Sequence, residues 1–180
     1  MAICNPTGSL SVTIREEIRL PNGNMEQSIN TKVITDVNQI MKRTDTIAPT
    51  FSGSGIEILR FVDSEEQQTA GSFVRDTVKY MRFTNLCSTN FVSLYLIQDS
   101  PEAQNPNTGN VGSGDESLFK LDAGKSMVFS NAQFQGTDYY DYVVEGYVDI
   151  QYFSSFASLS SIKAKADTAN VQIEYFVASS

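Results

Sequence analysis

The residues best suited to chemistry lie in one short stretch, "TDYYDY", at residues 137–142. Carboxylates beside aromatic rings suit a sugar site, because carboxylates accept hydrogen bonds from hydroxyl groups, and carboxylate oxygens are also the ligands that calcium prefers. The same residue types are ordinary where a loop meets another subunit. We interpret the stretch first as a subunit or core contact, then as a sugar site and then as a calcium site. Its candidate residues are Asp138, Tyr139, Tyr140, Asp141 and Tyr142.

Three other groups have a simpler explanation than chemistry. "GNVGSG" at 109–114 has glycines that let a backbone approach a phosphate, but it lacks the Lys-Ser/Thr of a nucleotide-binding loop, so a flexible surface loop is expected. A glycosidase carboxylate pair is defined by its separation in space, and the 21 acidic residues are first of all surface charge. Cys87 has only Arg82 as a nearby cation, so an inert thiol is expected.

The composition argues against several classes of function. Histidine is absent, which removes the commonest general base near neutral pH and the usual zinc ligand. The 13 basic and 21 acidic residues give a net charge of −8 without a basic cluster, so nucleic acid and anionic membranes are poor partners. We therefore expect no cofactor, no metal and no enzymatic activity.

The cysteines and the first residues bear on the compartment. Cys4 and Cys87 are too few and too far apart in sequence for a disulfide framework, so free thiols in a reducing cytosol are expected. The opening "MAICNPTGSL" lacks the basic start and the apolar run of a signal peptide. No stretch reaches the roughly 20 apolar residues of a membrane-spanning helix.

Apolar residues recur at every second position in most of the chain, which is typical of β-strands. Residues 10–20 alternate in this way, "PNGN" at 21–24 predicts a tight turn at Asn22-Gly23, and residues 25–34 are expected to return as the partner strand. Residues 35–46 are ambiguous, because Val37, Ile40 and Met41 have helical spacing. We interpret them as a short helix or irregular turn that leads into a strand.

The middle of the chain predicts further strand pairs. "VKYMRFTNLCSTNFVSLYLIQ" at 78–98 is interpreted as a hairpin with apolar residues on both faces, which favours a central position in a sandwich or a face covered by another copy. Strands at 118–122 and 126–130 are joined by "DAGK". In the closing strand Val171, Ile173, Tyr175 and Val177 are expected to face inward. Residues 99–117 form a long exposed polar loop.

The strand spacing predicts the architecture. About nine short strands without a strand–helix–strand rhythm indicate an all-β fold, an antiparallel β-sandwich with a jelly-roll-like arrangement. We expect one domain over residues 1–180, in which residues 1–50 belong to the sandwich or form an arm that packs on a neighbouring subunit.

Three sequence blocks suggest a family. "YMRFTNLCSTNFVSLYLI" (80–97), "LFKLDAGKSMVFSNA" (118–132) and "IKAKADTANVQIEYFVA" (162–178) resemble blocks that recur in small β-rich virion structural proteins of tailed bacteriophages. The resemblance implies a non-enzymatic building block, assembled in the host cytoplasm and carried on the virion as a capsid decoration (cement) protein or as a neck or tail component. Cys87 departs from the pattern, which has a polar turn residue there.

The expected function follows from this resemblance and from the composition. The chain is expected to form a homo-oligomer and to bind other virion proteins, either the major capsid protein or neck and tail proteins, through Tyr139, Tyr140, Tyr142, the 99–117 loop and the N-terminal residues up to Pro6. The main alternative is a host-receptor or glycan-binding module that uses Asp138 and Asp141. A third is an enzyme with paired carboxylates.

Overall fold

The computed structural model describes residues 8–49, 55–98, 116–130 and 159–180. These residues form eleven β-strands and two short 3-10 turns, Glu65–Gln67 and Arg75–Thr77. The described part has no α-helix, and in it no helix is long and apolar enough to cross a membrane. The all-β fold class predicted from the sequence is confirmed, with eleven strands in the described segments where about nine were expected.

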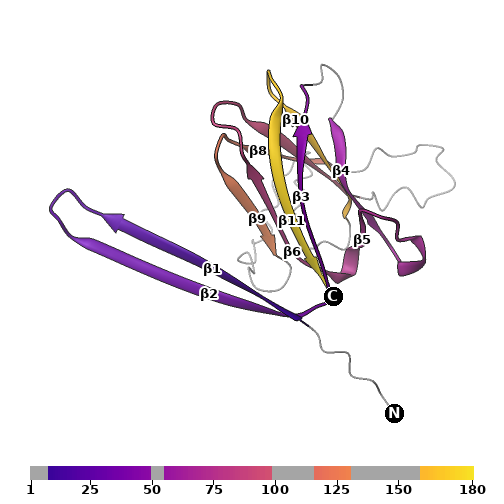
Figure 1. Ribbon diagram of the computed structural model, residues 1–180, viewed down its shortest axis with the longest axis horizontal. Coiled ribbons are helices and arrows are strands. Elements are labelled where there is room, and N and C mark those ends of the chain that lie inside the picture. The colour runs from indigo at the N-terminus through magenta and orange to yellow at the C-terminus, as the bar shows by residue number, and fades with distance from the viewer. Residues whose placement is uncertain (1–7, 50–54, 99–115, 131–158) are drawn as a thin grey trace, which may run out of the picture.

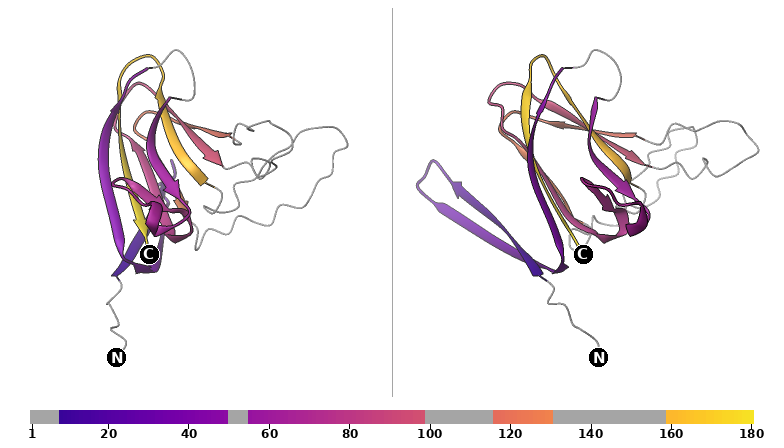
Figure 2. Two further views of the ribbon diagram at one scale, coloured as in Figure 1. Left: turned by 90° about the vertical axis from the view of Figure 1, so that its right-hand side faces the viewer. Right: turned by 45° about the vertical axis from the view of Figure 1, so that its right-hand side comes forward.

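Figure 1 shows a two-stranded hairpin that projects from a body of two larger sheets, and Figure 2 shows these two sheets face to face. Strands β1 and β2 form the hairpin, and the other nine strands form the body. The strands in chain order are β1 (Gly8–Arg19), β2 (Met25–Val37), β3 (Gln39–Ile47), β4 (Ile56–Val62), β5 (Ser72–Val74), β6 (Val78–Asn85), β7 (Val92–Gln98), β8 (Glu116–Leu121), β9 (Ser126–Ser130), β10 (Leu159–Ala166) and β11 (Val171–Ser179).

The body has the connectivity of a jelly roll. One sheet has the order β3-β11-β6-β9 and the other the order β5-β4-β10-β7-β8, and all neighbours are antiparallel except β5, which runs parallel to β4. Without the short β5, the first of the eight strands pairs with the last (β3 with β11), and the second with the seventh (β4 with β10). The third strand pairs with the sixth (β6 with β9), and the fourth with the fifth (β7 with β8), which completes the jelly-roll pattern. The predicted antiparallel β-sandwich is confirmed.

The core lies between the two sheets. Phe83 of β6 is fully buried, stacks on Tyr175 at a ring-centroid distance of 6.3 Å and meets Phe129 edge to face at 6.1 Å. The hydroxyl group of Tyr175 reaches the rim of the core, where it donates a hydrogen bond of 2.5 Å to the Asp45 carboxylate. Burial and this hydrogen bond raise the pKa of Tyr175 above its ordinary value. The inward residues of the closing strand are those predicted, namely Val171, Ile173, Tyr175 and Val177.

Residues 78–98 do not form the predicted hairpin. Strands β6 and β7 belong to different sheets, so residues 86–91 cross the sandwich. The buried Asn85 side chain holds this crossing: its amide group donates to the carbonyl oxygens of Asn90 (2.9 Å) and Leu121 (3.1 Å), and its oxygen accepts from the Cys87 N–H (2.9 Å). The "DAGK" turn likewise joins strands of different sheets, β8 and β9. Alternation predicts which face of a strand is apolar, but it does not identify the partner strand.

The short helix that the sequence allows within residues 35–46 is absent. The irregular turn given as its alternative corresponds to Asp36, which has a φ of +58°, and to Asn38, and the expected strand follows as β3. Strand β2 continues to Val37, and β3 follows after one residue. Met41 packs against the core, whereas Ile40 projects outward and 65% of its surface is exposed. Val37 is buried in a separate apolar cluster. The helical spacing of these three residues is therefore coincidental, because they belong to two strands and three environments.

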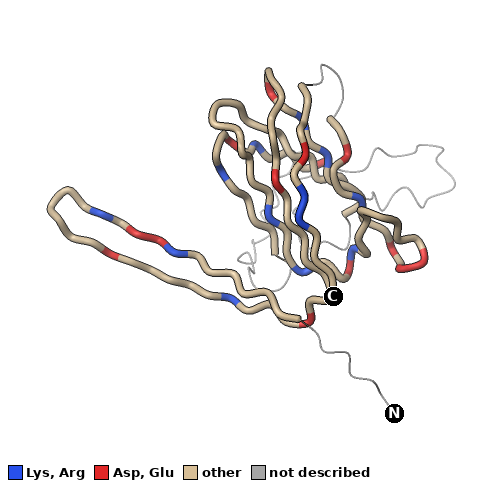
Figure 3. Tube along the Cα trace, in the orientation of Figure 1, with Lys and Arg blue, Asp and Glu red and all other residues tan. Residues whose placement is uncertain are grey.

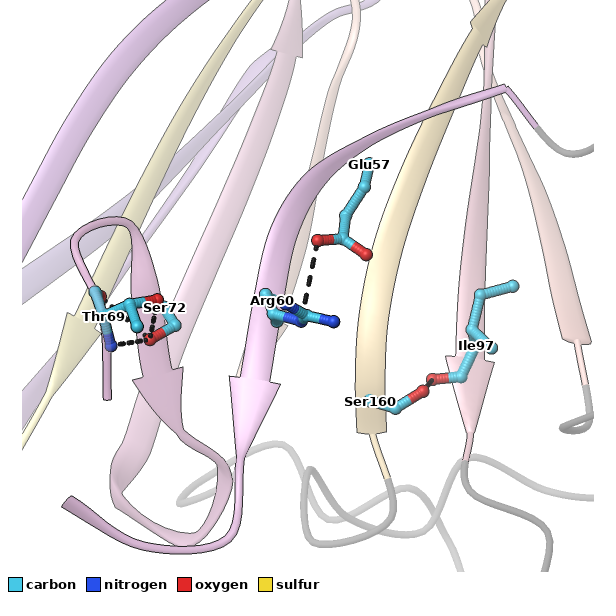
Figure 4. A network of polar contacts seen from close by, with 6 residues as sticks. All are labelled: Glu57, Arg60, Thr69, Ser72, Ile97 and Ser160. Carbon is cyan, nitrogen blue, oxygen red and sulfur yellow. Dashed lines mark hydrogen bonds and ion pairs between the residues drawn. The ribbon is translucent and has the colours of Figure 1, made fainter. Parts of the chain in front are cut away.

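Serine hydroxyl groups form hydrogen bonds at two irregular points of the five-stranded sheet, as Figure 4 shows. The Ser72 hydroxyl donates to the Thr69 carbonyl oxygen (2.9 Å) and accepts from the Thr69 N–H (2.7 Å), which closes the turn that leads into β5. Ser160 is the extra residue of a bulge in β10, and its hydroxyl donates to the Ile97 carbonyl oxygen (3.1 Å). These bonds satisfy polar groups that regular strand pairing leaves over.

The core packing gives a first prediction. Replacing Phe83 with alanine should lower the free energy of unfolding by about 3–5 kcal/mol, because it leaves a cavity next to Tyr175 and Phe129. Ile40→Ala, in which a largely exposed side chain is shortened, should cost less than about 1 kcal/mol. Urea unfolding followed by circular dichroism measures both changes. Equal losses for the two variants would contradict this account of the core.

Candidate assembly surface on the hairpin arm

Most of the contact residues expected from the sequence lie outside the described residues. This holds for the N-terminal residues up to Pro6 and for residues 99–115 of the long loop, while residues 116 and 117 begin strand β8. The subunit, sugar and calcium interpretations of the aromatic stretch therefore stay predictions. Its five residues, also outside the described segments, are Asp138, Tyr139, Tyr140, Asp141 and Tyr142.

The candidate surface in the described part is the projecting hairpin, Gly8–Val37, which we call the hairpin arm. At its tip the Gly23 N–H donates to the Leu20 carbonyl oxygen (3.0 Å), and the Leu20 N–H donates to the Asn24 carbonyl oxygen (2.9 Å). Gly23 has a φ of +85°, a conformation that glycine adopts without steric cost. The hairpin predicted at "PNGN" is confirmed, with a three-residue loop in which only Gly23 has positive φ.

A bulge lies at the root of the arm, where it joins the body. Ser9 of β1 faces two residues of β2, Thr35 and Asp36. Asp36 has a φ of +58° and is the only non-glycine residue of the described segments with positive φ. A Cβ atom on Gly8 would lie 2.9 Å from the Val37 carbonyl oxygen, so the two backbones approach closely there. Because bulges bend a strand pair, this one is placed to set the direction in which the arm leaves the sandwich (Figure 1).

The root packs on the outer face of the four-stranded sheet. Ile34 and Val37 of the arm are buried with Tyr80 of β6 and Ala178 of β11. The burial raises the pKa of the Tyr80 hydroxyl above its ordinary value. The outward apolar side of β6 is therefore covered by the chain's own arm. Partly buried residues at the margin of this cluster are Leu10, Val12 and Phe176.

Beyond the root, the arm exposes apolar side chains on both faces. Residues directly opposite in the strand pair project to the same face, so the register places the apolar residues of β1 on one face and Met25, Ile29 and Val33 of β2 on the other. The exposed fractions of these three β2 side chains are 63%, 61% and 50%. Six of the eleven exposed large hydrophobic residues of the described segments belong to the arm, namely Ile14, Ile18, Leu20, Met25, Ile29 and Val33.

The two strands of the arm differ in charge, as Figure 3 shows. On β1, Glu17 pairs with Arg15 at 3.4 Å and with Arg19 at 2.6 Å. Between the tip and the bulge, β2 has only two charged residues, Glu26 and Lys32. The charged side chains therefore gather along one strand of the arm, and the apolar residues of β2 lie along the other.

The sequence predicted the strand pair and gave an arm over residues 1–50 as one of two expectations, but it did not identify which residues such an arm exposes. Alternation along β1 is the same for a core strand and for a projecting one. The available signal was on β2, where Met25, Ile29 and Val33 are four residues apart instead of two. A strand that is buried on one face would place apolar residues at the intervening positions as well.

An ion-pair group lies on the outer face of the same sheet as the arm root. The Glu174 carboxylate of β11 accepts hydrogen bonds from Lys42 of β3 (3.0 Å) and from Arg82 of β6 (2.7 Å). Lys42 and then Arg82 hold the pKa of Glu174 below its ordinary value. The three side chains connect three neighbouring strands, a structural role that needs no ligand.

Cys87 is a free, partly exposed thiol in the crossing between the sheets. Its sulfur accepts a hydrogen bond from the Asn90 N–H (3.4 Å) and lies 3.6 Å from the Thr89 hydroxyl oxygen. These donors, first the Asn90 N–H and then Thr89, lower the pKa of the thiol to about 7. This differs from the inert thiol predicted from the sequence, because the donors are supplied by the turn geometry and not by a charged neighbour. Across the described segments, no group of three or more Cys, Asp and Glu residues could hold a metal ion.

The thiol gives a second prediction. In a Cys4→Ser variant, the alkylation rate of Cys87 by iodoacetamide should reach half its maximum near pH 7, since the thiolate is the nucleophile and its fraction rises as the pH passes the pKa. In the same variant unfolded by urea, where the turn is lost, the midpoint should move up to about 8.5. A midpoint near 8.5 in the folded protein would show that the turn does not stabilise the thiolate.

Comparisons with known proteins do not identify a relative. No protein family matches the chain, and no curated protein or solved structure is significantly similar to it. The resemblance to phage virion proteins therefore stays a hypothesis based on the three sequence blocks.

Proposed function

We propose that this chain is a non-enzymatic structural protein of a bacteriophage particle, and that its hairpin arm joins it to a neighbouring subunit. The single observation that supports this proposal best is the arm itself, a long strand pair that leaves the sandwich and exposes apolar side chains on both faces. A two-stranded hairpin with no further cover is only marginally stable in water. A partner that covers the arm would remove both its apolar surface and its unpaired strand edges from solvent.

The sandwich is compatible with this role but does not distinguish it from other functions. Jelly rolls occur in viral capsid proteins and also in lectins, and a fold by itself does not define a function. The virion setting rests on the resemblance of residues 80–97, 118–132 and 162–178 to phage structural proteins. In this proposal the partners are copies of the same chain together with the major capsid protein or neck and tail proteins, on a virion assembled in the host cytoplasm.

The glycan-binding alternative has less support. Its candidate residues, Asp138 and Asp141, lie outside the described residues, and nothing in the described part of the chain favours a sugar.

A shortened arm tests the proposal, which gives a third prediction. Residues 15–29 are replaced by Asn-Gly, which joins Ile14 and Asn30 across a two-residue turn. The root and the sandwich are kept, so the melting temperature should change by less than about 4 °C, whereas cosedimentation with particles that lack the protein should be lost.

A matched control keeps the arm and changes an exposed apolar residue elsewhere. Leu118 on β8 has 61% of its surface exposed, similar to Ile29, and Leu118→Ser should cosediment like the parent protein. Unchanged cosedimentation of the shortened variant would refute the role of the arm in particle binding.

A further inference from the structure

We infer that two copies of this chain associate through the outer edges of their β2 strands, antiparallel and about a two-fold axis that passes between the two copies of Ile29. The result is a four-stranded sheet with the order β1-β2-β2-β1 made from two hairpin arms. This inference deepens the proposed function, on which it rests for the biological role of the contact, because it names the edge and the register that join two subunits.

The outer edge of β2 has backbone groups that can form hydrogen bonds with a second strand. Strand β2 pairs with β1 on one side, and among the described residues no third strand joins this two-stranded sheet. The turn makes Leu20 and Asn24 a hydrogen-bonded pair, so by alternation the pair of Arg15 with Ile29 is not hydrogen-bonded within the arm. The backbone N–H and C=O groups of Ile29 therefore point away from β1, and the same holds for Gln27 and Thr31. A second strand can accept and donate at these three residues.

One register of two antiparallel β2 strands brings opposite charges together. When an antiparallel β2 pair is centred on Ile29, Glu26 of each copy lies opposite Lys32 of the other, so two opposite-charge pairs form. Gln27 then faces Thr31, and Ser28 faces Asn30, which are uncharged polar pairs. No other two-fold register of this strand pairs Glu26 with Lys32, because these two residues are equidistant from Ile29 alone.

The same register brings the exposed apolar side chains of β2 into contact. In the same register the two Ile29 side chains meet at the axis, and Met25 of each copy lies opposite Val33 of the other, all on the face away from Glu26 and Lys32. These residues are at least half exposed in the single chain. Association thus places three apolar contacts on one face of the new sheet, the Ile29 pair at the axis and a Met25–Val33 pair on each side, with the Gln27–Thr31 pairs between them. Charge pairing and apolar contact select the same alignment.

The other edge of the arm offers a poorer match. Two-fold registers of β1 centred on Arg15, Glu16 or Glu17 place like charges opposite each other, although the register centred on Glu16 also pairs Arg15 with Glu17. A register centred on Ile18 pairs Glu17 with Arg19, but its axis lies one residue from the end of β1, so the two strands overlap over a short length only. A register centred on Ile14 places Val12 opposite Glu16 and forms no opposite-charge pair. Figures 1 and 2 also show β1 on the side of the arm nearer the sandwich and β2 on the side away from it. The edge with the matching sequence is therefore also the more accessible one.

The fourth prediction tests the charge pairs by exchange in the full chain. Glu26→Lys places a lysine opposite Lys32 at both ends of the contact. The dissociation constant of the dimer, measured by sedimentation velocity, should rise by roughly tenfold or more. Adding Lys32→Glu to this variant restores opposite charges and should restore the parent affinity within roughly threefold. The matched control is Glu16→Lys, the same charge change on β1, which should leave the dimer unchanged.

A cross-link tests the position of the axis. In a Cys4→Ser, Cys87→Ser background, Ile29→Cys should form a disulfide-linked dimer under mild oxidation, since facing residues of an antiparallel pair have Cα atoms about 5.5 Å apart. Ser28→Cys should run as a monomer on a non-reducing gel after the same oxidation. In the proposed register Ser28 of one copy lies opposite Asn30 of the other, so the two introduced thiols are two residues apart along the strands.

The outcomes decide the inference separately from the proposed function. A monomer at the highest soluble concentration, a Glu26→Lys variant that dimerises like the parent, or a double variant that does not recover would overturn the β2 contact. Loss of cosedimentation by the shortened arm together with an unchanged Glu26→Lys dimer would leave the structural role standing and refute this interface. If Glu26→Lys abolishes the dimer but the parent protein does not cosediment with particles, the β2 contact is supported and the proposed function is refuted.

Discussion

Strand β11 is the element on which both parts of the molecule depend. It pairs with β3 on one edge and with β6 on the other, and its inward residues, Tyr175 among them, are fully buried in the core. Its outward residues Phe176 and Ala178 support the root of the hairpin arm. One strand therefore carries the sandwich core on one face and the anchor of the arm on the other, so the direction of the arm is tied to the packing of the body.

Sequence patterns predicted those features that depend on local geometry. Alternation identified the strands and the inward face of β11, and Asn22-Gly23 identified the turn of the arm. The pairing of distant strands was not predicted, because alternation does not select a partner: β6 and β7 are neighbours in sequence but belong to different sheets, and the buried Asn85 amide that holds their crossing looks like any turn residue. The candidate surface was foreseen only as one of two alternatives, an arm over residues 1–50, and its exposed residues were not identified, since exposure depends on whether another sheet covers a strand.

The strand edges explain why the proposed association uses the arm and not the sandwich. Exposed edges invite pairing with another chain, and short or charged edge strands oppose it. In the body, β5 has three residues, β9 has five, and β3 carries Lys42, Arg43 and Asp45 along its length. Strand β2 has thirteen residues, of which two are charged between the tip and the bulge. It is the longest and least protected edge among the described strands.

Charge does not oppose the proposed contact on the arm. The arm between Gly8 and Ile34 has three basic and three acidic residues, so this segment has no net charge. An axis at Ile29 leaves eight residues of β2 between the axis and each root, which is roughly 27 Å of extended strand. Because the screening length at physiological ionic strength is about 8 Å, charges at the root of one copy, such as Asp36, are largely screened from those of the other copy. The proposed contact therefore joins segments without net charge, in which the pairs of Glu26 with Lys32 meet no excess of like charge.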